Sequence, residues 1–456
     1  MSKQQKILYP LESLFGQVLS PFERFLQRTT AGGIVLIGTS LLTLLIANSH
    51  WGEGFHHFWE QAMVLSIGSW ELKQSLHHWV NDGLMAFFFL LVGLEIKREI
   101  LVGELSSLRD AVLPIGAAIG GMVVPALIYA LFNYGTSSAS GWGIPMATDI
   151  AFAIGILVLL AWRIPRSLII FLTALAIVDD LGAVFVIALF YTHEINVIAL
   201  AWAASVLALL ILLNRGGIRH PLPYILAGIA LWYMTLLSGL HATVAGILLA
   251  LTIPARPAFT PGQFDQRLQE LGRGFHAAIL DPHTPDHPLS NHRMAMIAEN
   301  VERAAITVQP PLQRMEHGLS TWVTFLVIPI FALANAGIDF SHIDFAASIS
   351  APVTLGVIFG LVLGKFIGIS GSCWLILKLG WGKMPQGVNW RHLTGAAWLG
   401  GIGFTMSLFI GGMAFTNPQQ FEDAKLGILL SSLIAATLGL IWLYIGSGDL
   451  KEKHSG

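Results

Sequence analysis

The sequence predicts an all-α polytopic membrane protein with about twelve transmembrane helices, and three observations lead to this fold class. Hydrophobic residues make up 54% of the 456 residues and charged residues only 11%, whereas a soluble domain carries about 25% charged residues. Mean hydropathy is +0.68. Apolar runs of roughly 20 residues, the length that crosses the hydrocarbon core of a bilayer, recur along the chain.

Twelve apolar segments are the candidate spans. They lie near residues 31–49, 78–98, 111–133, 141–161, 167–190, 196–213, 221–237, 240–253, 319–337, 352–377, 393–416 and 424–446. The eighth of these is short for a complete crossing. We expect eight helices within residues 1–253, a long cytoplasmic loop at 254–318, four helices within 319–446 and a cytoplasmic tail at 447–456.

The positions of Lys and Arg give an independent test of this segmentation. If the N-terminus is cytoplasmic and the chain alternates, 22 of the 25 Lys and Arg residues fall on the cytoplasmic side. The positive-inside rule requires such a bias, and a wrong number of spans would scramble it. The exceptions are Lys73 and Lys425, expected in outer loops, and Lys365, inside a span. Both termini are thus expected in the cytoplasm, with the protein in a bacterial inner membrane.

Composition also narrows the function classes. The net charge of −2 gives no indication of a nucleic-acid partner. A single cysteine, Cys373, excludes an internal disulfide and is expected to pack as a small apolar helix residue. No cleavable signal peptide is apparent, so the first long apolar helix would serve as the targeting signal. No cofactor is indicated.

Two soluble pieces interrupt the spans. In the loop at 254–318 we expect one surface helix, Met294–Thr307, and otherwise little order. Residues 63–74 read as two short strand-like pieces around Gly68-Ser69, which predicts a β-hairpin on the outer side. Because an isolated hairpin is marginal in water, it would need something to pair with, such as a second subunit.

Adjacent carboxylates within a span are the strongest functional signal. Asp179 and Asp180 lie in the middle of the segment 167–190. Two unpaired charges at that depth would be very costly, so protons or a bound cation must neutralise them. We therefore predict a site that holds either protons or a hard cation through carboxylate oxygens; a salt-bridged pair without a transport role is the alternative.

Asp149 and Lys365 are two further ionisable residues at membrane depth. Asp149 follows Thr148 in a segment interrupted by Pro145, so a helix break there would expose N-termini that a carboxylate offsets. Dipole compensation and ion ligation are both open to Asp149, and the Thr148 hydroxyl would face the same opening. Lys365 needs a carboxylate or free helix carbonyls as partner. We favour Asp179, with helix C-termini or a snorkelling side chain as alternatives.

A second interruption is the stretch 400–407, which reads Gly-Gly-Ile-Gly-Phe-Thr-Met-Ser. This glycine cluster is either a close-packing surface of small residues or an unwound stretch that lines a site. Interrupted segments in corresponding parts of two halves favour the second reading, because they mark the binding site in secondary transporters.

Four charged or titratable residues allow weaker assignments. Asp82 lies near the outer end of its span, either as a partly solvated end residue or as a support for the site. Glu95 and Glu99 are one helical turn apart at the inner end and either form a solvated charged end or line a cytoplasmic mouth. His241 is either a packing histidine or a proton carrier.

These motifs resemble those of the NhaA-type sodium/proton antiporters over about Gly32 to Ile445. The matching stretches are 80–82 with 91–99 for the family's second helix, 147–153 for its broken fourth helix, 175–182 for its ion-site helix, and 364–365 with 401–407 for its tenth and eleventh helices. Interrupted segments mark the binding site in several families of secondary transporters, and this family is one of them.

The resemblance implies more than the pattern of charges does. It implies twelve helices, with helices 3–5 and 10–12 as inverted-topology repeats whose broken helices cross at mid-membrane. Asp180, with Asp179, would bind sodium or lithium in competition with protons, and Asp149 and Lys365 would balance the half-helix ends. Exchange would be electrogenic, with two protons entering per sodium ion expelled. The outer hairpin would form a homodimer. The positions that match pH-sensing residues are Glu95, Glu99, His241 and Glu316.

Two features depart from the family pattern. The loop between the eighth and ninth helices is much longer than in the best-known members, which bears on loop-borne pH regulation and on Glu316. Phe366 stands where those members carry a proline after the lysine, which bears on the helix geometry near Lys365 but not on its charge.

Two other functions need buried aspartates or broken spans. An intramembrane aspartyl protease needs carboxylates on facing helices, and neighbours on one helix point about 100° apart, so Asp149 with Asp180 would be the only sensible dyad. A passive cation channel would carry sodium without coupled proton movement. Of these readings, exchange at the pair Asp179 and Asp180 fits the residues best.

Overall fold

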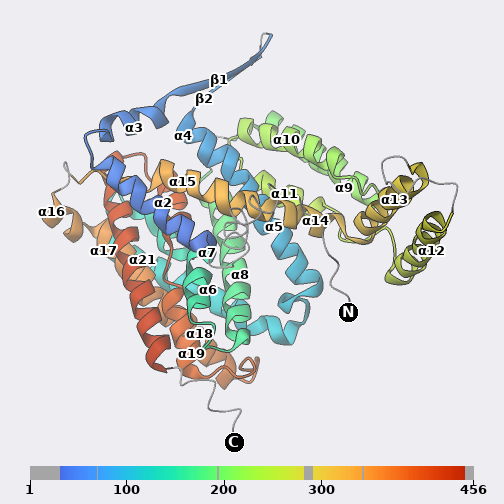
Figure 1. Cartoon of the computed structure of the whole chain (residues 1–456). Coiled ribbons are helices and arrows are strands. Elements are labelled where there is room, and N and C mark those ends of the chain that lie inside the picture. Colours follow the sequence, from blue (N-terminus) through green and yellow to red (C-terminus); the bar gives the residue numbers. More distant parts are fainter. Residues whose placement is uncertain (1–30, 69, 193–194, 282–290, 341–343, 447–456) are drawn as a thin grey trace, which may run out of the picture. The chain divides into compact units, whose positions relative to one another are not determined.

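The computed structural model describes residues 31–68, 70–192, 195–281, 291–340 and 344–446, and nearly all of its elements are helices (Figure 1). The predicted cytoplasmic N-terminus and the tail at 447–456 lie outside the described residues. The chain divides into two compact units. The first consists of Met1–Phe88, Glu99–Thr192 and Trp322–Gly456, and the second of Phe89–Arg98 and His193–Thr321.

The first unit carries both interrupted segments. Up to residue 192 its elements are α2 (Ala31–Ala47), α3 (Gly52–Glu60), β1 (Ala62–Ile67), β2 (Trp70–Ser75), α4 (Leu76–His78), the π-helix η1 (Trp79–Leu84), the ends of α5 (Met85–Val102), η2 (Glu104–Ser106), α6 (Leu108–Phe132), η3 (Ala139–Met146), α7 (Ile150–Leu159) and α8 (Arg166–Phe190).

After residue 322 the first unit continues with further helices. They are the π-helix η4 (Val323–Val327), α15 (Ile328–Asn335), α16 (Phe345–Ser350), α17 (Pro352–Phe359), the π-helix η5 (Gly360–Gly364), α18 (Lys365–Lys378), α19 (Trp390–Leu399), α20 (Phe404–Ala414) and α21 (Pro418–Gly446).

The second unit is built around the middle of α5. It adds α9 (Val197–Arg215), α10 (Pro221–Leu237), α11 (Val244–Thr252), α12 (Pro261–Ile279), α13 (His292–Val308) and most of α14 (Pro311–Trp322). Its core joins α5, α9, α10, α11 and α14 through buried side chains that include Leu94, Leu210, Tyr224 and Leu249.

Each of the twelve predicted spans coincides with helix in the structure. Within the described residues, seven helices are long and apolar enough to cross a membrane, or up to nine if each of two bent helix pairs is one span. The protein is therefore an all-α, multi-pass membrane protein, as predicted. The predicted eighth span contains only the nine-residue α11, and the total of twelve crossings stays a prediction.

Exposed apolar side chains show which helices need an apolar surrounding. Helix α9 has a mean hydropathy of 2.4, yet only 17% of it is buried inside the chain. Ile198 and Trp202 are 73% and 60% exposed. A helix with such a surface is stable in lipid, where the bilayer replaces the packing that a soluble core would supply.

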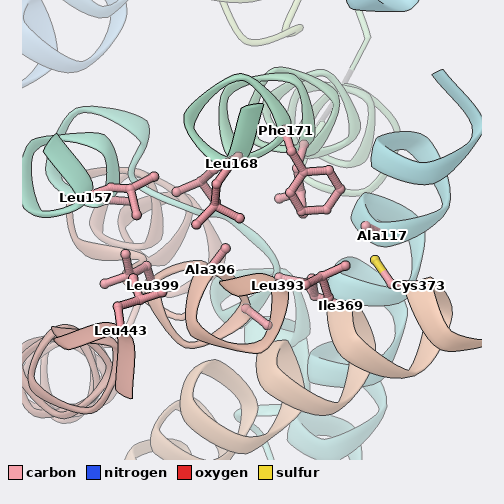
Figure 2. Close-up of a cluster of buried hydrophobic side chains, with 14 of the residues drawn as sticks. Ala117, Leu157, Leu168, Phe171, Ile369, Cys373, Leu393, Ala396, Leu399 and Leu443 are labelled. Carbon is pink, nitrogen blue, oxygen red and sulfur yellow. The ribbon is translucent and has the colours of Figure 1, made fainter. Parts of the chain in front are cut away.

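A cluster of buried apolar side chains holds the first unit together. Figure 2 shows buried residues of α6, α7, α8, α18, α19 and α21 converging on one core, with Phe171, Ile369 and Leu399 among them. Cys373 of α18 lies inside this cluster and is fully buried, which confirms its interpretation as a small apolar packing residue. The core keeps α8, α18 and α19 in contact, and these helices carry Asp179, Lys365 and the glycine break.

The long loop is more ordered than predicted. The surface helix expected at Met294–Thr307 is present as α13, but the expectation of little order elsewhere is wrong for Pro261–Ile279, which forms α12. Thr260 and Gln263 form a capping box at its start, and Pro261 occupies the first turn. These are strong helix-start signals. Helix α12 packs against α13. The buried residues of the two helices are Leu271 and Ala278 of α12 and Met294 and Ala304 of α13.

The hairpin predicted at 63–74 is present. Strands β1 and β2 pair antiparallel from Ala62 opposite Ser75 to Ile67 opposite Trp70, and Gly68 turns the chain with a positive φ of 62°. One boundary was placed wrongly: Lys425, expected in an outer loop, lies within α21 and is only 7% exposed. Its ammonium donates to the Gly337 carbonyl and to Glu422, so hydrogen bonds rather than bulk water satisfy it.

Glycines let α6 and α18 pack backbone to backbone. A Cβ atom added at Gly368 of α18 would overlap the carbonyl oxygen of Gly120 in α6, whereas one added at Gly371 meets nothing within 4 Å. Small residues at helix contacts are how membrane helices approach closely. Helix α18 begins with Lys365, so this contact also sets the position of that lysine.

We predict that Gly368→Ala destabilises the protein while Gly371→Ala does not. The overlap at Gly368 requires backbone movement and should cost about 1–3 kcal/mol of unfolding free energy. At Gly371 the same substitution should be neutral or stabilise by up to about 1 kcal/mol, because alanine favours a helix interior over glycine. Thermal unfolding in detergent, followed by circular dichroism, measures both. Equal midpoints for the two variants would contradict the proposed contact.

Candidate functional site

Two interrupted helices form the frame of the site. In the first, η3 ends at Met146 and α7 begins at Ile150, with extended backbone at Ala147 and Asp149. In the second, α19 ends at Leu399 and α20 begins at Phe404, bent by 43° from it. The glycine cluster is therefore an unwound stretch, as the sharper of the two sequence readings proposed.

The two breaks hydrogen-bond to each other. The Asp149 amide donates to the Ile402 carbonyl at 2.6 Å. The Thr148 hydroxyl donates to the Gly400 carbonyl at 2.8 Å, and the Ser407 hydroxyl donates to the Ile144 carbonyl, also at 2.8 Å. Backbone groups that lose their helical partners within an apolar bundle need such replacements, so each break supplies the missing partners of the other.

Asp149 caps the N-termini of both half-helices. Its Oδ1 accepts from the Phe152 amide of α7 at 3.0 Å. Its Oδ2 accepts from the Thr405 amide and hydroxyl of α20, at 3.0 and 2.6 Å. Each helix N-terminus carries roughly half a positive charge, so two of them balance about one carboxylate. This geometry favours dipole compensation, one of the two roles left open for Asp149.

Asp179 and Lys365 form a fully buried ion pair. The Lys365 ammonium lies 2.6 Å from Asp179 Oδ2, and both side chains are 0% exposed. The pairing that we favoured from the sequence is thus present, and the snorkelling alternative is wrong because Lys365 has no exposed surface. Asp180, the next residue on α8, is also 0% exposed and acts electrostatically on the same ammonium. One lysine therefore faces two carboxylates.

Thr148 links the break to the ion pair. It is fully buried, its hydroxyl donates to Gly400, and it lies next to Asp179. The first break, the second break and α8 therefore meet at this threonine. A displacement of either broken helix would move groups that touch Asp179.

The remaining candidates lie on η1, α5 and α14 and just before α11. Asp82 is half-buried in η1, and Glu95 and Glu99 are half-buried on α5. Glu316 is buried on α14 and forms an ion pair with Arg98. Within the second unit, Lys97 donates to the carbonyls of Leu251 and Ile253 at the C-terminal end of α11, whereas His241 precedes the N-terminus of the same helix.

Sequence reasoning missed the contacts of Thr405 and Ser407. Both lie in the glycine-rich stretch, but no role was assigned to their hydroxyls. A Ser or Thr in the first turn of a half-helix is a signal that could have suggested them, because a hydroxyl there can satisfy backbone groups freed by a break.

Phe366, the residue that follows Lys365, also has a partner. Phe366 stacks on Trp398 of α19, with ring centroids 4.1 Å apart and an angle of 17° between the rings. Such an aromatic pair contributes about 0.5–1.5 kcal/mol beyond the area that it buries. Phe366 thus ties the start of α18 to the end of α19, directly beside Lys365 and the second break.

Comparison with known proteins assigns the chain to a family. The sequence profile of the Na+/H+ antiporter 1 family matches residues 23–443. The chain is 62% identical over 444 residues to the Na(+)/H(+) antiporter NhaA of Syntrophobacter fumaroxidans, covering 97% of this chain and 94% of that protein. It is 59% identical over 427 residues to the protein of the same name from Acidithiobacillus ferrooxidans, covering 94% of this chain and 98% of that protein.

We predict that Lys365→Met strongly destabilises the protein and that adding Asp179→Leu largely restores it. The single change leaves a buried carboxylate without its partner and should cost about 3–5 kcal/mol, whereas replacing both members by apolar side chains is often neutral. Arg303→Met on α13 is the control, because it removes a mostly exposed pair with Glu299 and should cost less than about 1 kcal/mol. Thermal unfolding compares all three. A double variant no more stable than Lys365→Met would contradict this reading of the pair.

Proposed function

We infer the transport mechanism from the premise that this chain belongs to the Na+/H+ antiporter family, whose profile covers nearly all of it. Sodium ions and protons are its substrates, and it is a transporter rather than an enzyme, so the intramembrane protease alternative falls away. We propose that the exchange takes place at the buried aspartates of α8. The observation that carries this proposal is the group of Asp179, Asp180 and Lys365 without any exposed surface.

The charges of the site support competition between the two substrates. Because the two helix N-termini balance Asp149, the remaining buried group, with Asp179 and Asp180 ionised and Lys365 protonated, carries a net charge of −1. Isolated charge in a low-dielectric interior is costly and is removed by protonation or by a bound cation. Protons and a sodium ion therefore stabilise the same group, and loading one releases the other. Asp180 and Asp179 would supply the carboxylate oxygens that sodium binds.

This charge balance also supports an electrogenic exchange. The two α8 carboxylates can take up two protons, whereas one bound sodium ion already brings the group to neutrality, so a cycle that carries two protons inward and one sodium ion outward moves one net positive charge inward. Two protons per sodium ion is the proposed ratio. The membrane potential then contributes about 2.3 kcal/mol per elementary charge for each 100 mV. Lithium, a smaller monovalent cation that also prefers oxygen ligands, is a proposed alternative substrate.

Alternating access would arise from movement of the broken helices. The hydrogen bonds between the breaks involve few residues, and Thr148 couples them to Asp179. We propose that sodium binding weakens the bond between Lys365 and Asp179, and that the breaks then rearrange so that the site opens to the other side. In this scheme the two interrupted helices, η3 with α7 and α19 with α20, occupy corresponding positions in two inverted repeats. Asp82 supports the path by which ions reach the site from the outer side.

Regulation, location and assembly complete the proposal. The proposed pH-sensing residues on the cytoplasmic side are Glu95, Glu99, His241 and Glu316. Of these, Glu316 forms an ion pair with Arg98. We place the protein in the bacterial inner membrane with both termini in the cytoplasm.

The hairpin supports a proposed homodimer. Met63, Val64 and Leu65 on β1 are each between 38% and 45% exposed. A two-stranded sheet leaves two unpaired edges, which favours pairing with a second copy of the chain.

We predict that Asp180→Asn abolishes sodium-driven proton movement. The amide keeps the shape of the carboxyl group but neither takes up a proton nor carries the charge that holds sodium. Asp265→Asn is the control, because Asp265 is exposed on α12 and should exchange at the wild-type rate. Proteoliposomes with an imposed sodium gradient and an internal pH dye measure the rate. Wild-type exchange by Asp180→Asn would refute the assignment, and sodium flux without proton movement in the wild type would favour a channel.

We also predict that the apparent KM for sodium falls as pH rises. If two protons compete with each sodium ion, as proposed, a rise of one pH unit should lower the apparent KM by up to about a hundredfold while both carboxylates are protonated, and by about tenfold while one of them is. Initial rates at several sodium concentrations and pH values, with the pH equal on both sides, give this dependence. A KM that does not change with pH while the maximal rate does would place protons and sodium at separate sites.

A further inference from the structure

Helix α12 carries an apolar stripe that the described residues leave uncovered. Leu268, Phe275 and Ile279 are each between 38% and 51% exposed. They are separated by seven and four residues, which make about two turns and one turn, so the three side chains lie on one side of the helix. Gly272 lies on the same side, and a Cβ atom built there would meet no atom of the described residues within 4 Å.

The contact of α12 with α13 uses a different side of the helix. A Cβ atom at Gly274 would lie 3.5 Å from Cδ1 of Ile297 in α13. Leu271 and Ala278, about one turn away in each direction, are buried. Residues 272, 275 and 279 directly follow these three, so the exposed stripe is turned about 100° from the side that faces α13. An amphipathic helix needs apolar residues only where it is covered, and the wider apolar surface of α12 therefore indicates a second contact.

Hydrogen bonds hold the base of this helix pair at the end of α11. The Leu312 amide, in the first turn of α14, donates to the Pro254 carbonyl at 3.1 Å. The Ala258 amide donates to the Thr307 carbonyl near the end of α13, also at 3.1 Å. Helix α11 ends at Thr252, so these bonds close the loop within a few residues of an apolar helix. The pair α12 and α13 is thus kept beside the C-terminal end of α11.

That end of α11 lies where lipid and water meet. Asn214 of α9 donates from its side chain to the Thr252 carbonyl, so the C-terminal ends of α9 and α11 lie together. Leu212 of α9 and Leu222 of α10 are more than half exposed, and α9 ends at Arg215. Apolar surface next to basic residues is typical of the cytoplasmic surface of a membrane. The lipid that covers Leu212 and Leu222 therefore reaches the base of the loop.

Two properties of the stripe favour a bilayer over a protein partner. Specific protein interfaces bury at least about 1,200 Å², which is far more than a stripe of three side chains offers. A helix on a membrane needs only an apolar face, and the closed base makes its contact with the bilayer intramolecular. The charged residues of α12 are Asp265, Arg267, Glu270 and Arg273. They balance, so apolar surface rather than headgroup charge would drive the contact.

We propose that α12 is an interfacial helix whose stripe of Leu268, Phe275 and Ile279 is inserted into the surface of the bilayer beside the ends of α9 and α11. Its partner is the layer of phospholipids on the side of the membrane where α11 ends. Helices of this kind bury their apolar face about 5–10 Å into the boundary between headgroups and acyl chains. The inference gives a role to a helix that the proposed exchange does not use, and it is tested without any ion gradient.

The test places a nitroxide spin label on each side of α12, in Phe275→Cys and in Gln266→Cys. Gln266 is exposed and lies nine residues from Phe275, which puts it on the opposite side of the helix. Cys373 is buried, and the unsubstituted chain measures any background labelling. The proteins are reconstituted in vesicles of phosphatidylcholine, with and without phosphatidylglycerol. Collisions of each label with oxygen, which concentrates in lipid, and with a water-soluble nickel chelate are then measured.

We expect the label at 275 to meet oxygen more often than the label at 266, and the nickel chelate roughly fivefold less often or below. Ile279→Cys should repeat the result from a second position on the stripe, and both lipid compositions should give the same values. Equal access of the chelate at 275 and 266 would overturn the proposal. Protection of position 275 from both reagents would also overturn it, because it would place the stripe against protein. A contact that forms only with phosphatidylglycerol would contradict an apolar driving force.

Discussion

Backbone groups that lose their helical partners inside an apolar bundle must find others nearby, and in this protein two interrupted helices satisfy each other. Asp149 accepts from the N-termini of both α7 and α20, and Thr148 donates to a carbonyl of the second break. This reciprocal bonding holds two irregular stretches at one place and orients Thr148 toward Asp179. The position of the ion pair therefore depends on the breaks. A movement of one break must be accompanied by a movement of the other break or of the ion pair. In the proposed mechanism, that dependence would connect ion binding to helix movement.

Charge balance then decides what the site can hold. The two half-helix N-termini together offset roughly one negative charge, and Asp149 supplies it, so Asp149 need not release its charge when an ion arrives. Asp179 and Asp180 share a single ammonium, which leaves the α8 carboxylates underbalanced whenever both are ionised. A buried ion pair contributes little net stability because desolvation offsets the attraction. Apolar residues could replace the pair at little cost in stability, so its presence supports the proposal that the site changes its charge during each transport cycle.

Much of this could be predicted from the sequence because ionisable residues and glycines are rare in spans and stand out there. Asp179 with Lys365, the break after Pro145, the glycine break and the hairpin all carry such local signals. What sequence reasoning missed depends on contacts between distant segments, which no local pattern connects. These contacts are Thr405 with Asp149, Ser407 with Ile144, and Phe366 with Trp398. The error at α12 had a different cause. Its capping box and proline at the first turn were present in the sequence, but a polar composition was taken as a sign of little order.

Phe366, which stands where the resemblance led us to expect a proline, raises the question of what fixes Lys365 in this chain. A proline after the lysine would restrict the backbone and remove one hydrogen-bond donor. Here the turn before Lys365 is the π-helix η5, a form that often marks functional sites. A Cβ atom at Gly364 would lie 2.7 Å from the Cα atom of Pro125 in α6, so the backbone before the lysine is held by direct contact. On the other side, Phe366 is held by its stack with Trp398. Lys365 is therefore fixed by packing on both sides, and the aromatic pair couples its helix to the second break more directly than a proline would.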